Sequence, residues 1–412
     1  MESSAAIELA KHVLSTFAVI LAFGSAFGLL AQKFKVPDVA VFLLLGMALG
    51  PEIAGLVKIK ADSALNQIIL IFGASYILFD GGASLRLKVL KEVWITIVIL
   101  ATVGVLITAG ITAVAAYYVF SVPFIVALLM AMAIASTDPA TLVPVFRQVK
   151  IKDRVAQTVM SESAFNDATG AIATFAVLGI AMGHGGEFSI GAALWDLLKQ
   201  AGIGFLAGGI LGYLAALLIA HEKLGFFKEN TPVVTLMAVI GAYLGADGFQ
   251  ASGFMAVFVF GIMLGNKDAF GFKMEHGDQE KMEDFVATTA FIMRMFIFIL
   301  LGSQVDFSLM NKYLVGGVIV VTVFMLAARP VTVFLCALPD RRAQWSFKEM
   351  LFMCWTRETG VIPGALAGLL LGMGAPEAKL IASVTFLAIL MTILIQATTT
   401  KWLAGKLGLL VE

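Results

Sequence analysis

The stretch of the chain that decides its fold is residues 156–181, which read AQTVMSESAFNDATGAIATFAVLGIA. It is long enough to cross a bilayer, since a transmembrane helix needs about 20 predominantly apolar residues. Its first half nevertheless carries two carboxylates, Glu162 and Asp167. An ionisable side chain at the centre of a membrane costs at least about 2.5 kcal/mol, so we expect these residues to serve a function.

The rest of the chain has the composition of a membrane protein. Of its 412 residues, 60% are hydrophobic and 14% are charged, whereas soluble domains carry about 25% charged residues. The net charge is zero at pH 7, which gives no indication of a nucleic-acid partner. The two cysteines, Cys336 and Cys354, lack metal-ligand spacing. No ATP or cofactor motif is present, so we expect no cofactor and no enzymatic activity.

Hydropathy predicts thirteen membrane spans. Their approximate bounds are 9–32, 38–57, 64–82, 92–119, 123–146, 156–181, 191–219, 231–246, 250–265, 285–302, 312–337, 347–371 and 376–401. Of the 28 basic residues, 19 fall in one set of alternating loops, 6 fall on the other side, and Arg294, Arg329 and Arg357 lie inside spans. Cytoplasmic loops are the ones rich in Lys and Arg. We therefore expect a multi-pass protein of the cell (inner or plasma) membrane, with the N-terminus outside and the C-terminus in the cytoplasm.

Equivalent spans recur at an almost constant distance along the chain. Span 4 begins near residue 92 and span 11 near residue 312, and the other pairs are also about 220 residues apart. This spacing predicts two six-helix units joined by span 7. Because seven spans separate equivalent helices, the two units have opposite topology. Secondary transporters are commonly built from such inverted repeats.

Each half contains a span that is interrupted in mid-membrane. Span 5 carries STDP at residues 136–139, and span 12 carries TRETG at residues 356–360. The two threonines, Thr137 and Thr356, are 219 residues apart, so the interruptions occupy matching positions. Asp followed by Pro is typical of a helix N-cap and first turn. We therefore expect crossed, broken helices whose freed backbone groups are satisfied by protein or by a wet cavity.

The polar residues of span 6 divide between two faces of its helix. Glu162 and Asp167 are five positions apart and point about 140° away from each other. Ser163 lies one turn before Asp167 on the same face, so these two residues and the break at Thr137 and Asp138 are predicted to form one polar cluster. Oxygen ligands of this kind suit a small monovalent cation.

The remaining charged residues leave alternatives open. Glu162 needs a cationic partner, for which Arg329 in span 11 and Arg357 in span 12 are the candidates, and the pair is interpreted as a structural brace. A structural pair with Arg357 is the alternative for Asp167, and helix capping alone is the alternative for Asp138. Asp80, at the end of span 3, is interpreted as part of a helix end, with an ion funnel as the alternative.

Taken together, these strings resemble the NhaP/NHE branch of the monovalent cation/proton antiporters. The matching stretches are TDP at 137–139, ESAFND at 162–167, FDGG at 79–82, LLG at 300–302 with Asp306, and ARP at 328–330. They occur in the family's order and cover nearly the whole membrane domain. TDP alone is a weak signal, but its combination with ESAFND at this spacing is specific.

The resemblance implies a homodimer of thirteen-helix protomers. Each protomer of the family has a dimerisation domain and a core domain that contains the crossed, broken helices. In this chain the dimerisation or scaffold domain would comprise residues 1–82 and 231–302, which are spans 1–3 and 8–10. The core ion-translocation domain would comprise residues 92–181 and 312–403, with residues 191–220 as a linking helix.

The resemblance also assigns roles to individual residues. Asp167 would be the carboxylate that binds both cation and proton. The residues that would line or adjoin the ion site are Thr137, Asp138, Ser163 and Asp80. Glu162 would pair with Arg329, and Asn166 would position the site. The Asn-Asp pair is typical of the electroneutral branch, which exchanges one cation for one proton.

One stretch departs from the family's pattern. Many relatives carry Gly-x-Arg-Gly in span 12, where this chain has WTRETG at residues 355–360. Glu358, next to Arg357, therefore adds a carboxylate beside the broken helix, and both are accessory candidates for the site. This departure keeps potassium open as an alternative to sodium or lithium.

The sequence thus predicts a secondary transporter that exchanges Na⁺ or Li⁺ for H⁺ by alternating access. Its partners would be a monovalent cation, the proton and the lipid bilayer. The cation and the proton would compete for Asp167, so that exchange is obligatory. A K⁺/H⁺ antiporter with the same mechanism is the alternative. Two interpretations from other classes are a cation channel, which the crossed breaks argue against, and an intramembrane aspartyl protease using Asp138 and Asp167.

Overall fold

The computed structural model describes residues 2–34, 36–61, 63–137, 146, 151–183, 190–220, 227 and 230–410. Within these residues the regular secondary structure is helical, apart from one isolated bridge between Ile151 and Leu410. Nine of the described helices are long and apolar enough to cross a membrane, and four shorter apolar helices accompany them. The chain is therefore the all-helical, multi-pass membrane protein that its hydropathy predicts.

The first half of the chain forms spans 1 to 6. In order, these are α1 (Glu2–Phe34), α2 (Asp38–Leu49), α3 (Ala64–Ala83), the continuous run of α4 (Leu87–Ile99), η1 (Leu100–Gly104) and α5 (Val105–Phe120), then α6 (Phe124–Ala135) and α8 (Asp153–Ala181). Span 7 is α9 (Ile190–Ala220). The helix of span 2 ends earlier than predicted, at Leu49, because Pro51 forces the preceding Gly50 into an extended conformation.

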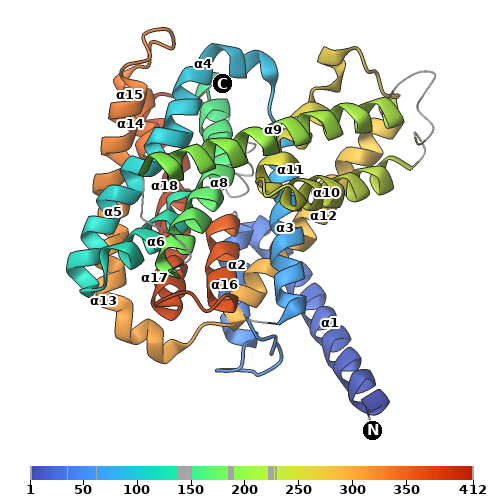
Figure 1. Ribbon diagram of the computed structural model, residues 1–412, viewed down its shortest axis with the longest axis vertical. Helices are drawn as coiled ribbons and strands as arrows, with labels where there is room; N and C mark the ends of the chain where they lie inside the picture. The colour runs from blue at the N-terminus through green and yellow to red at the C-terminus, as the bar shows by residue number, and fades with distance from the viewer. Residues whose placement is uncertain are drawn as a thin grey trace.

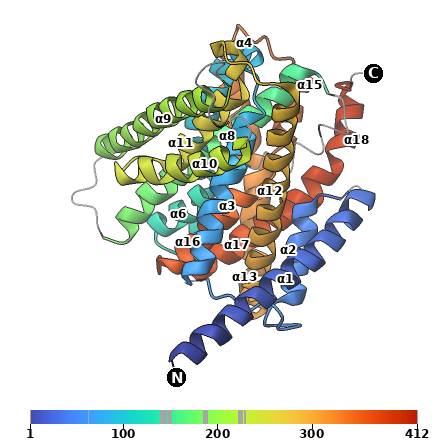
Figure 2. The same cartoon turned by 90° about the vertical axis from the view of Figure 1, so that its right-hand side faces the viewer.

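The second half forms spans 8 to 13. In order, these are α10 (Thr231–Gly248), α11 (Gly253–Gly265), the short η3 (Lys267–Phe270), α12 (His276–Ser303), the run of α13 (Phe307–Val323), η4 (Phe324–Ala328) and α14 (Arg329–Ala337), the two half-helices α15 (Phe347–Trp355) and α16 (Val361–Gly372), and the run of α17 (Ala378–Met391), η5 (Thr392–Ala397) and α18 (Thr398–Leu407). The chain termini lie at opposite ends of the molecule in both views (Figures 1 and 2), as an odd number of spans requires.

Helix lengths show the inverted repeat directly. The four short apolar helices begin at Asp38, Phe124, Gly253 and Ile362. They belong to spans 2, 5, 9 and 12, which form two pairs seven spans apart. Spans 4 and 11 form another such pair, and each contains a π-helical turn, η1 and η4. The described helices therefore recur with the spacing that the predicted repeat of two six-helix units requires.

Close helix packing repeats with the same spacing. Where α2 crosses α12, a Cβ atom on Gly46 would lie only 2.3 Å from the carbonyl oxygen of Ile299. Where α11 crosses α3, a Cβ atom on Gly265 would lie 2.1 Å from the carbonyl oxygen of Ala83. Gly265 follows Gly46 by 219 residues, so both halves use glycine to bring two backbones into contact.

Most of the helices pack around the two largest buried apolar clusters among the described residues. One draws mainly on α2, α3, α10, α11 and α12, and the other on α5, α6, α13 and α17. The corresponding groups of helices occupy opposite sides of the molecule (Figure 1). Residues of α8 and α16 belong to both clusters. The helix that carries Glu162 and Asp167 therefore lies where the two groups meet.

Candidate functional site

The polar segment of α8 is covered by protein. Only 2% of Glu162 and 1% of Asp167 is exposed, and the side chains of Ser163 and Asn166 are buried as well. The helical backbone itself is satisfied by its own hydrogen bonds, which makes a helix compatible with the membrane interior. The free-energy cost of placing this segment in a membrane therefore comes from its polar side chains. The residues that these side chains contact determine the possible function of the segment.

The break in span 5 is fastened to α8 by hydrogen bonds. After α6 ends at Ala135, the backbone N–H of Thr137 donates to the Oδ1 of Asn166 at 2.9 Å. The Thr137 hydroxyl donates to the Oγ of Ser163 at 2.8 Å, and the Nδ2 of Asn166 donates to the Thr137 Oγ1 at 2.9 Å. Thr137, Ser163 and Asn166 thus form one buried polar cluster, a turn or less from Asp167.

Asp138 and Pro139 lie outside the described residues, so the predicted part of Asp138 in this cluster stays a prediction. Asp80 belongs to the last turn of α3, where its carbonyl oxygen accepts a hydrogen bond from the N–H of Ser84. The Asp80 residue is half-buried. Its place near the end of a helix agrees with what its sequence neighbours, two glycines, indicate.

The break in span 12 meets the break in span 5. Residues 356–360 are not helical, and from this segment the Nη2 of Arg357 donates a hydrogen bond to the carbonyl oxygen of Ala135, the last residue of α6. The last carbonyls of a helix have no partner within it, and a positive charge near them is favourable. Arg357 also lies over the ring of Phe324, 4.4 Å from its centroid. The two interrupted helices are therefore joined end to end by a buried guanidinium.

The other side of the span 12 break is attached to span 13. The N–H of Thr359 donates to the Oγ1 of Thr392 at 3.0 Å, at the start of the π-helical η5. One turn later, Gln396 is buried, and neither polar atom of its side chain has a hydrogen-bond partner. Glu358 is buried in the same break. The surroundings of this break are thus polar, whereas a membrane core is normally apolar.

Glu162 forms an ion pair with Arg329. The two terminal nitrogens of Arg329 donate to the two carboxylate oxygens of Glu162, one of them at 2.8 Å, and its Nε donates to the carbonyl oxygen of Met353 at 3.0 Å. This two-pronged geometry is the strong form of an Arg–carboxylate contact. Of the two arginines that the sequence leaves open as partners, the structure gives Arg329. The pair connects α8 with α14 and α15.

A half-buried charge pair joins two residues that the sequence does not connect. The Nε of Arg294 in α12 lies 3.5 Å from the Oδ2 of Asp38 at the start of α2. An arginine inside a span signals that a partner must exist, but nothing in the sequence identifies a residue so far away. The attachment of Thr359 to Thr392 was equally invisible, because it depends on helix packing.

Known proteins share this sequence pattern and this fold. The chain matches the family described as "Sodium/hydrogen exchanger, transmembrane" over residues 18–406. It is 33% identical to Na(+)/H(+) antiporter 1 of Methanocaldococcus jannaschii, over 94% of each chain. It is 27% identical to the K(+)/H(+) antiporter NhaP of Alkalimonas amylolytica, over 91% of this chain and 64% of that relative. The solved structure of the sodium proton antiporter MjNhaP1 at pH 8 superimposes with a TM-score of 0.83 at 30% identity, covering 99% of both chains.

Proposed function

Because the chain belongs to the transmembrane sodium/hydrogen exchanger family, we propose that it exchanges Na⁺ or Li⁺ for H⁺ across a cell membrane. The observation that carries the proposal is Asp167, a carboxylate with 1% exposure in the middle of a spanning helix. Such a group is retained in a membrane for an ion or proton pathway. The energy comes from the gradient of one ion, since the chain carries no ATP motif.

The cation would be held by hard oxygen atoms around Asp167. Ser163 lies one turn away on the same face of α8, and its hydroxyl already contacts the Thr137 hydroxyl at the end of α6. Together with Asp138, these side chains would provide the carboxylate and hydroxyl oxygens that a small monovalent cation prefers. Asn166 would act on the cation indirectly, because it holds the backbone of Thr137 in place at the break.

Exchange would follow from competition at one carboxylate. Asp167 can be neutralised by a proton or by a cation, and binding of one excludes the other. If only the occupied site crosses between the two sides, each inward passage of one ion requires outward passage of the other. With one carboxylate as carrier, the stoichiometry is one cation for one proton, and the exchange is electroneutral.

The moving body in this mechanism would be the core domain, residues 92–181 and 312–403. The Glu162–Arg329 pair and the contact of Arg357 with Ala135 support this idea, because they join α8, α14, α15, α6 and the span 12 break into one unit. Residues 1–82 and 231–302 would form the stationary scaffold and the contact between two protomers of a homodimer. In the cell membrane the N-terminus would lie outside and the C-terminus in the cytoplasm.

K⁺/H⁺ exchange by the same mechanism is a second candidate. The observation that favours it is Glu358, a buried carboxylate in the span 12 break at a position where the sequence departs from the family's pattern. An additional negative charge near the crossing changes the field that selects among cations. A relative of this chain is also named as a K⁺/H⁺ antiporter.

Transport into proteoliposomes tests the proposal. Vesicles with an acidic interior and a trapped pH dye receive Na⁺, Li⁺ or K⁺ outside, and the rise of internal pH is followed. We expect Na⁺ to raise the internal pH with the unaltered protein, and Asp167→Asn to abolish the response. The matched control is Glu280→Gln, which removes a carboxylate whose side chain is exposed in the first turns of α12.

Three outcomes would change the conclusion. A response to K⁺ alone would keep the mechanism and replace the cation. Exchange at the unaltered rate in Asp167→Asn would remove Asp167 from the mechanism. If the unaltered protein responded to no cation between pH 5 and pH 9, proton-coupled exchange would be excluded.

A further inference from the structure

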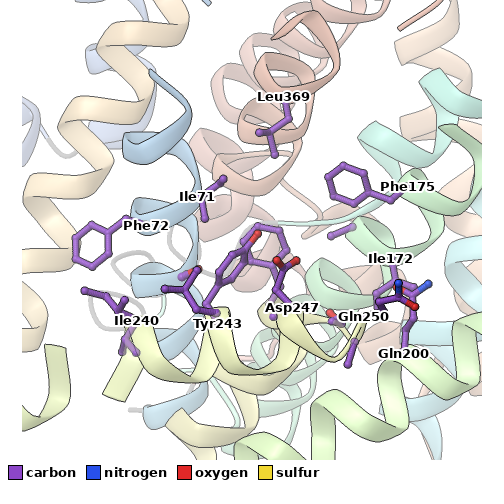
Figure 3. Close-up of a pocket in the computed structure, with 18 of the residues that line it drawn as sticks. Ile71, Phe72, Ile172, Phe175, Gln200, Ile240, Tyr243, Asp247, Gln250 and Leu369 are labelled. Atoms are coloured by element: carbon purple, nitrogen blue, oxygen red, sulfur yellow. The ribbon is translucent and has the colours of Figure 1, made fainter. Parts of the chain in front are cut away.

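A cavity of about 940 Å³ lies where α8 and α16 face α3, α10 and α11 (Figure 3). Six helices contribute to its wall, namely α3, α8, α9, α10, α11 and α16. Most of the lining side chains are apolar, and most of the polar ones gather in the last turns of α10 and the turn that follows it. The volume is many times that of a bare cation, so the cavity has room for an ion together with tens of water molecules, at about 30 Å³ each.

The cavity reaches the proposed ion site along α8. Ala171 and Ile172 line it, and Ala171 follows Asp167 by four residues. Residues four apart lie on the same face of a helix, here separated by about 6 Å along its axis. Phe175 continues this face one turn further and also lines the cavity, as Figure 3 shows. The cavity therefore approaches Asp167 from the C-terminal direction of α8.

This direction corresponds to the outside of the cell in the proposed orientation. The lining residues belong to the C-terminal halves of α8, α10 and α16 and to the N-terminal halves of α3, α9 and α11. With the N-terminus outside, the alternation of spans assigns all six of these halves to the external side. In that orientation the cavity would receive a cation from outside.

One carboxylate, Asp247, occurs among the described residues that line the cavity. It lies in the last turn of α10, and in Figure 3 it projects into the cavity beside Tyr243, below Leu369 and Phe175. The amide side chains of Gln200 and Gln250 lie on the same side. No lysine or arginine lines the cavity within the described part of the chain, and no ion pair of Asp247 is found there.

We propose that this cavity is the external entry vestibule and that Asp247 recruits the hydrated cation at its mouth, before the cation passes to Asp167. A cleft with low-dielectric walls and one sign of charge concentrates counter-ions and speeds their arrival. The apolar lining supplies such walls, and the oxygens of Tyr243, Gln200 and Gln250 can replace part of the hydration shell. This inference rests on the proposed function and on the proposed orientation.

Side-specific transport kinetics test the role of Asp247. Right-side-out and everted membrane vesicles are prepared from the unaltered protein, Asp247→Asn and Asp247→Glu. We expect Asp247→Asn to raise the KM for external cation about fivefold at low ionic strength, the effect of one unit charge acting through water at contact distance. The maximal rate and the KM for cytoplasmic cation should not change, and Asp247→Glu should behave as the unaltered protein. Choline chloride at high concentration should abolish the difference, because it screens an exposed charge.

Cysteine labelling tests the vestibule independently of transport. The two natural cysteines, Cys336 and Cys354, are buried, so an introduced thiol is seen against a low background. A charged, membrane-impermeant thiol reagent added outside should modify Ile172→Cys at the wall of the cavity. The control is Leu206→Cys, which is 64% exposed on α9 and does not line the cavity. A thiol facing lipid does not ionise and should stay unmodified.

The outcomes separate this inference from the proposed function. If the unaltered protein transports no cation, the proposed function fails, while labelling still reports on the cavity. If exchange is normal but Asp247→Asn leaves the external KM unchanged, Asp247 does not recruit the cation. Modification of Ile172→Cys only from the cytoplasmic side would overturn the external vestibule itself.

Discussion

The breaks in spans 5 and 12 occupy matching positions of the inverted repeat, yet they are held in place by different chemistry. At the first break, the neutral residue Thr137 is fastened to α8 through Ser163 and Asn166. At the second, a charged residue, Arg357, bonds to the end of α6, and Thr359 is anchored to span 13. One break is thus bound to α8, the helix that carries Asp167, and the other supports the first break.

The difference shows what a repeat preserves. Contacts that depend on backbone alone are the same in both halves, as the glycine crossings at Gly46 and Gly265 demonstrate. Contacts that depend on side chains have diverged, as expected if the proposed ion site needs only one set of ligands. The half that contains span 12 instead supplies a positive charge, Arg357, which stabilises the partial negative charge at the C-terminal end of α6. Three predictions test this division of roles.

The largest expected effect comes from the two buried arginines. Arg329 is paired with a buried carboxylate, whereas Arg357 bonds to a neutral carbonyl group. Removing one member of a buried ion pair costs about 3–5 kcal/mol, because the other charge is left alone. We therefore expect Arg329→Ala to lower the free energy of unfolding by that amount. Arg357→Ala should cost less, about 1–3 kcal/mol, the value for one unsatisfied buried group.

Thermal unfolding of the purified protein in detergent measures both variants. The matched control is the double variant Glu162→Leu with Arg329→Met. It should recover most of the stability lost in Arg329→Ala, because replacing a whole buried pair by apolar side chains is often neutral. Equal melting temperatures for Arg329→Ala and Arg357→Ala would show that the two arginines do not have different roles.

The sequence predicts those parts of the fold that depend on short stretches of neighbouring residues. Apolar stretches of about 20 residues and the uneven distribution of Lys and Arg predict the spans. The match to the sodium/hydrogen exchanger family confirms the family resemblance of ESAFND at residues 162–167. Charged residues in an apolar stretch stand out by themselves, which is why Glu162, Asp167 and Arg329 were recognised.

The sequence could not reveal contacts that depend on how distant helices pack. The pairing of Asp38 with Arg294 joins residues far apart in the chain. The π-helical turns η1, η4 and η5 lie inside apolar runs that also suit an ordinary α-helix. In span 2 the sequence does contain the local signal, because a proline at position 51 disfavours a helix at the preceding residue. Averaging hydropathy over a window of residues hid this signal and placed the end of the span too late.

An intermediate effect is expected from the two threonines at equivalent positions. The Thr137 hydroxyl bonds to side chains of α8, whereas the Thr356 hydroxyl bonds only to the carbonyl of Phe352 in its own helix. Valine has nearly the same shape as threonine and no hydroxyl. Each lost hydrogen bond is worth about 1 kcal/mol, so we expect Thr137→Val to raise the cation KM about ten- to thirtyfold. Thr356→Val should raise it less than about threefold.

Proteoliposome transport at graded cation concentrations gives the KM of both variants. Thr137→Ser serves as the control, because it keeps the hydroxyl and should remain near the unaltered protein. If Thr356→Val weakened cation binding as much as Thr137→Val, both breaks would contribute equally to the ion site. The two halves would then not differ in their contribution to cation binding.

The N-caps of α4 and α13 form a further pair, 220 residues apart, with different solutions. The N-cap of α13 is Asp306, whose carboxylate accepts hydrogen bonds from the N–H groups of Ser308 and Leu309. At the N-cap of α4, Arg86 makes no such bond, and the N–H of Leu87 donates instead to the side chain of Asn266 in the turn after α11. One helix is capped by its own residue and the other by a neighbouring helix.

The smallest effect is expected from Asp306. The hydroxyl of Ser308 and the N–H of Leu309 hold the pKa of this exposed carboxyl below its usual value of 3.8. A lowered pKa in the folded state means that the ionised cap stabilises the fold above the unfolded pKa and ceases to do so as the pH falls through the folded value. Asp306→Ala should therefore lower stability by about 1 kcal/mol at neutral pH, and the difference should become smaller as the pH falls below 3.8, because a protonated carboxyl still accepts the N–H bonds but carries no charge. Asp306→Asn also caps the helix without a charge, so its melting temperature at neutral pH should lie between those of the unaltered protein and Asp306→Ala. A loss in Asp306→Ala that persisted unchanged at low pH would mean that the charge of Asp306 is irrelevant, and no loss at neutral pH would mean that α13, like α4, depends on its neighbours for its stability.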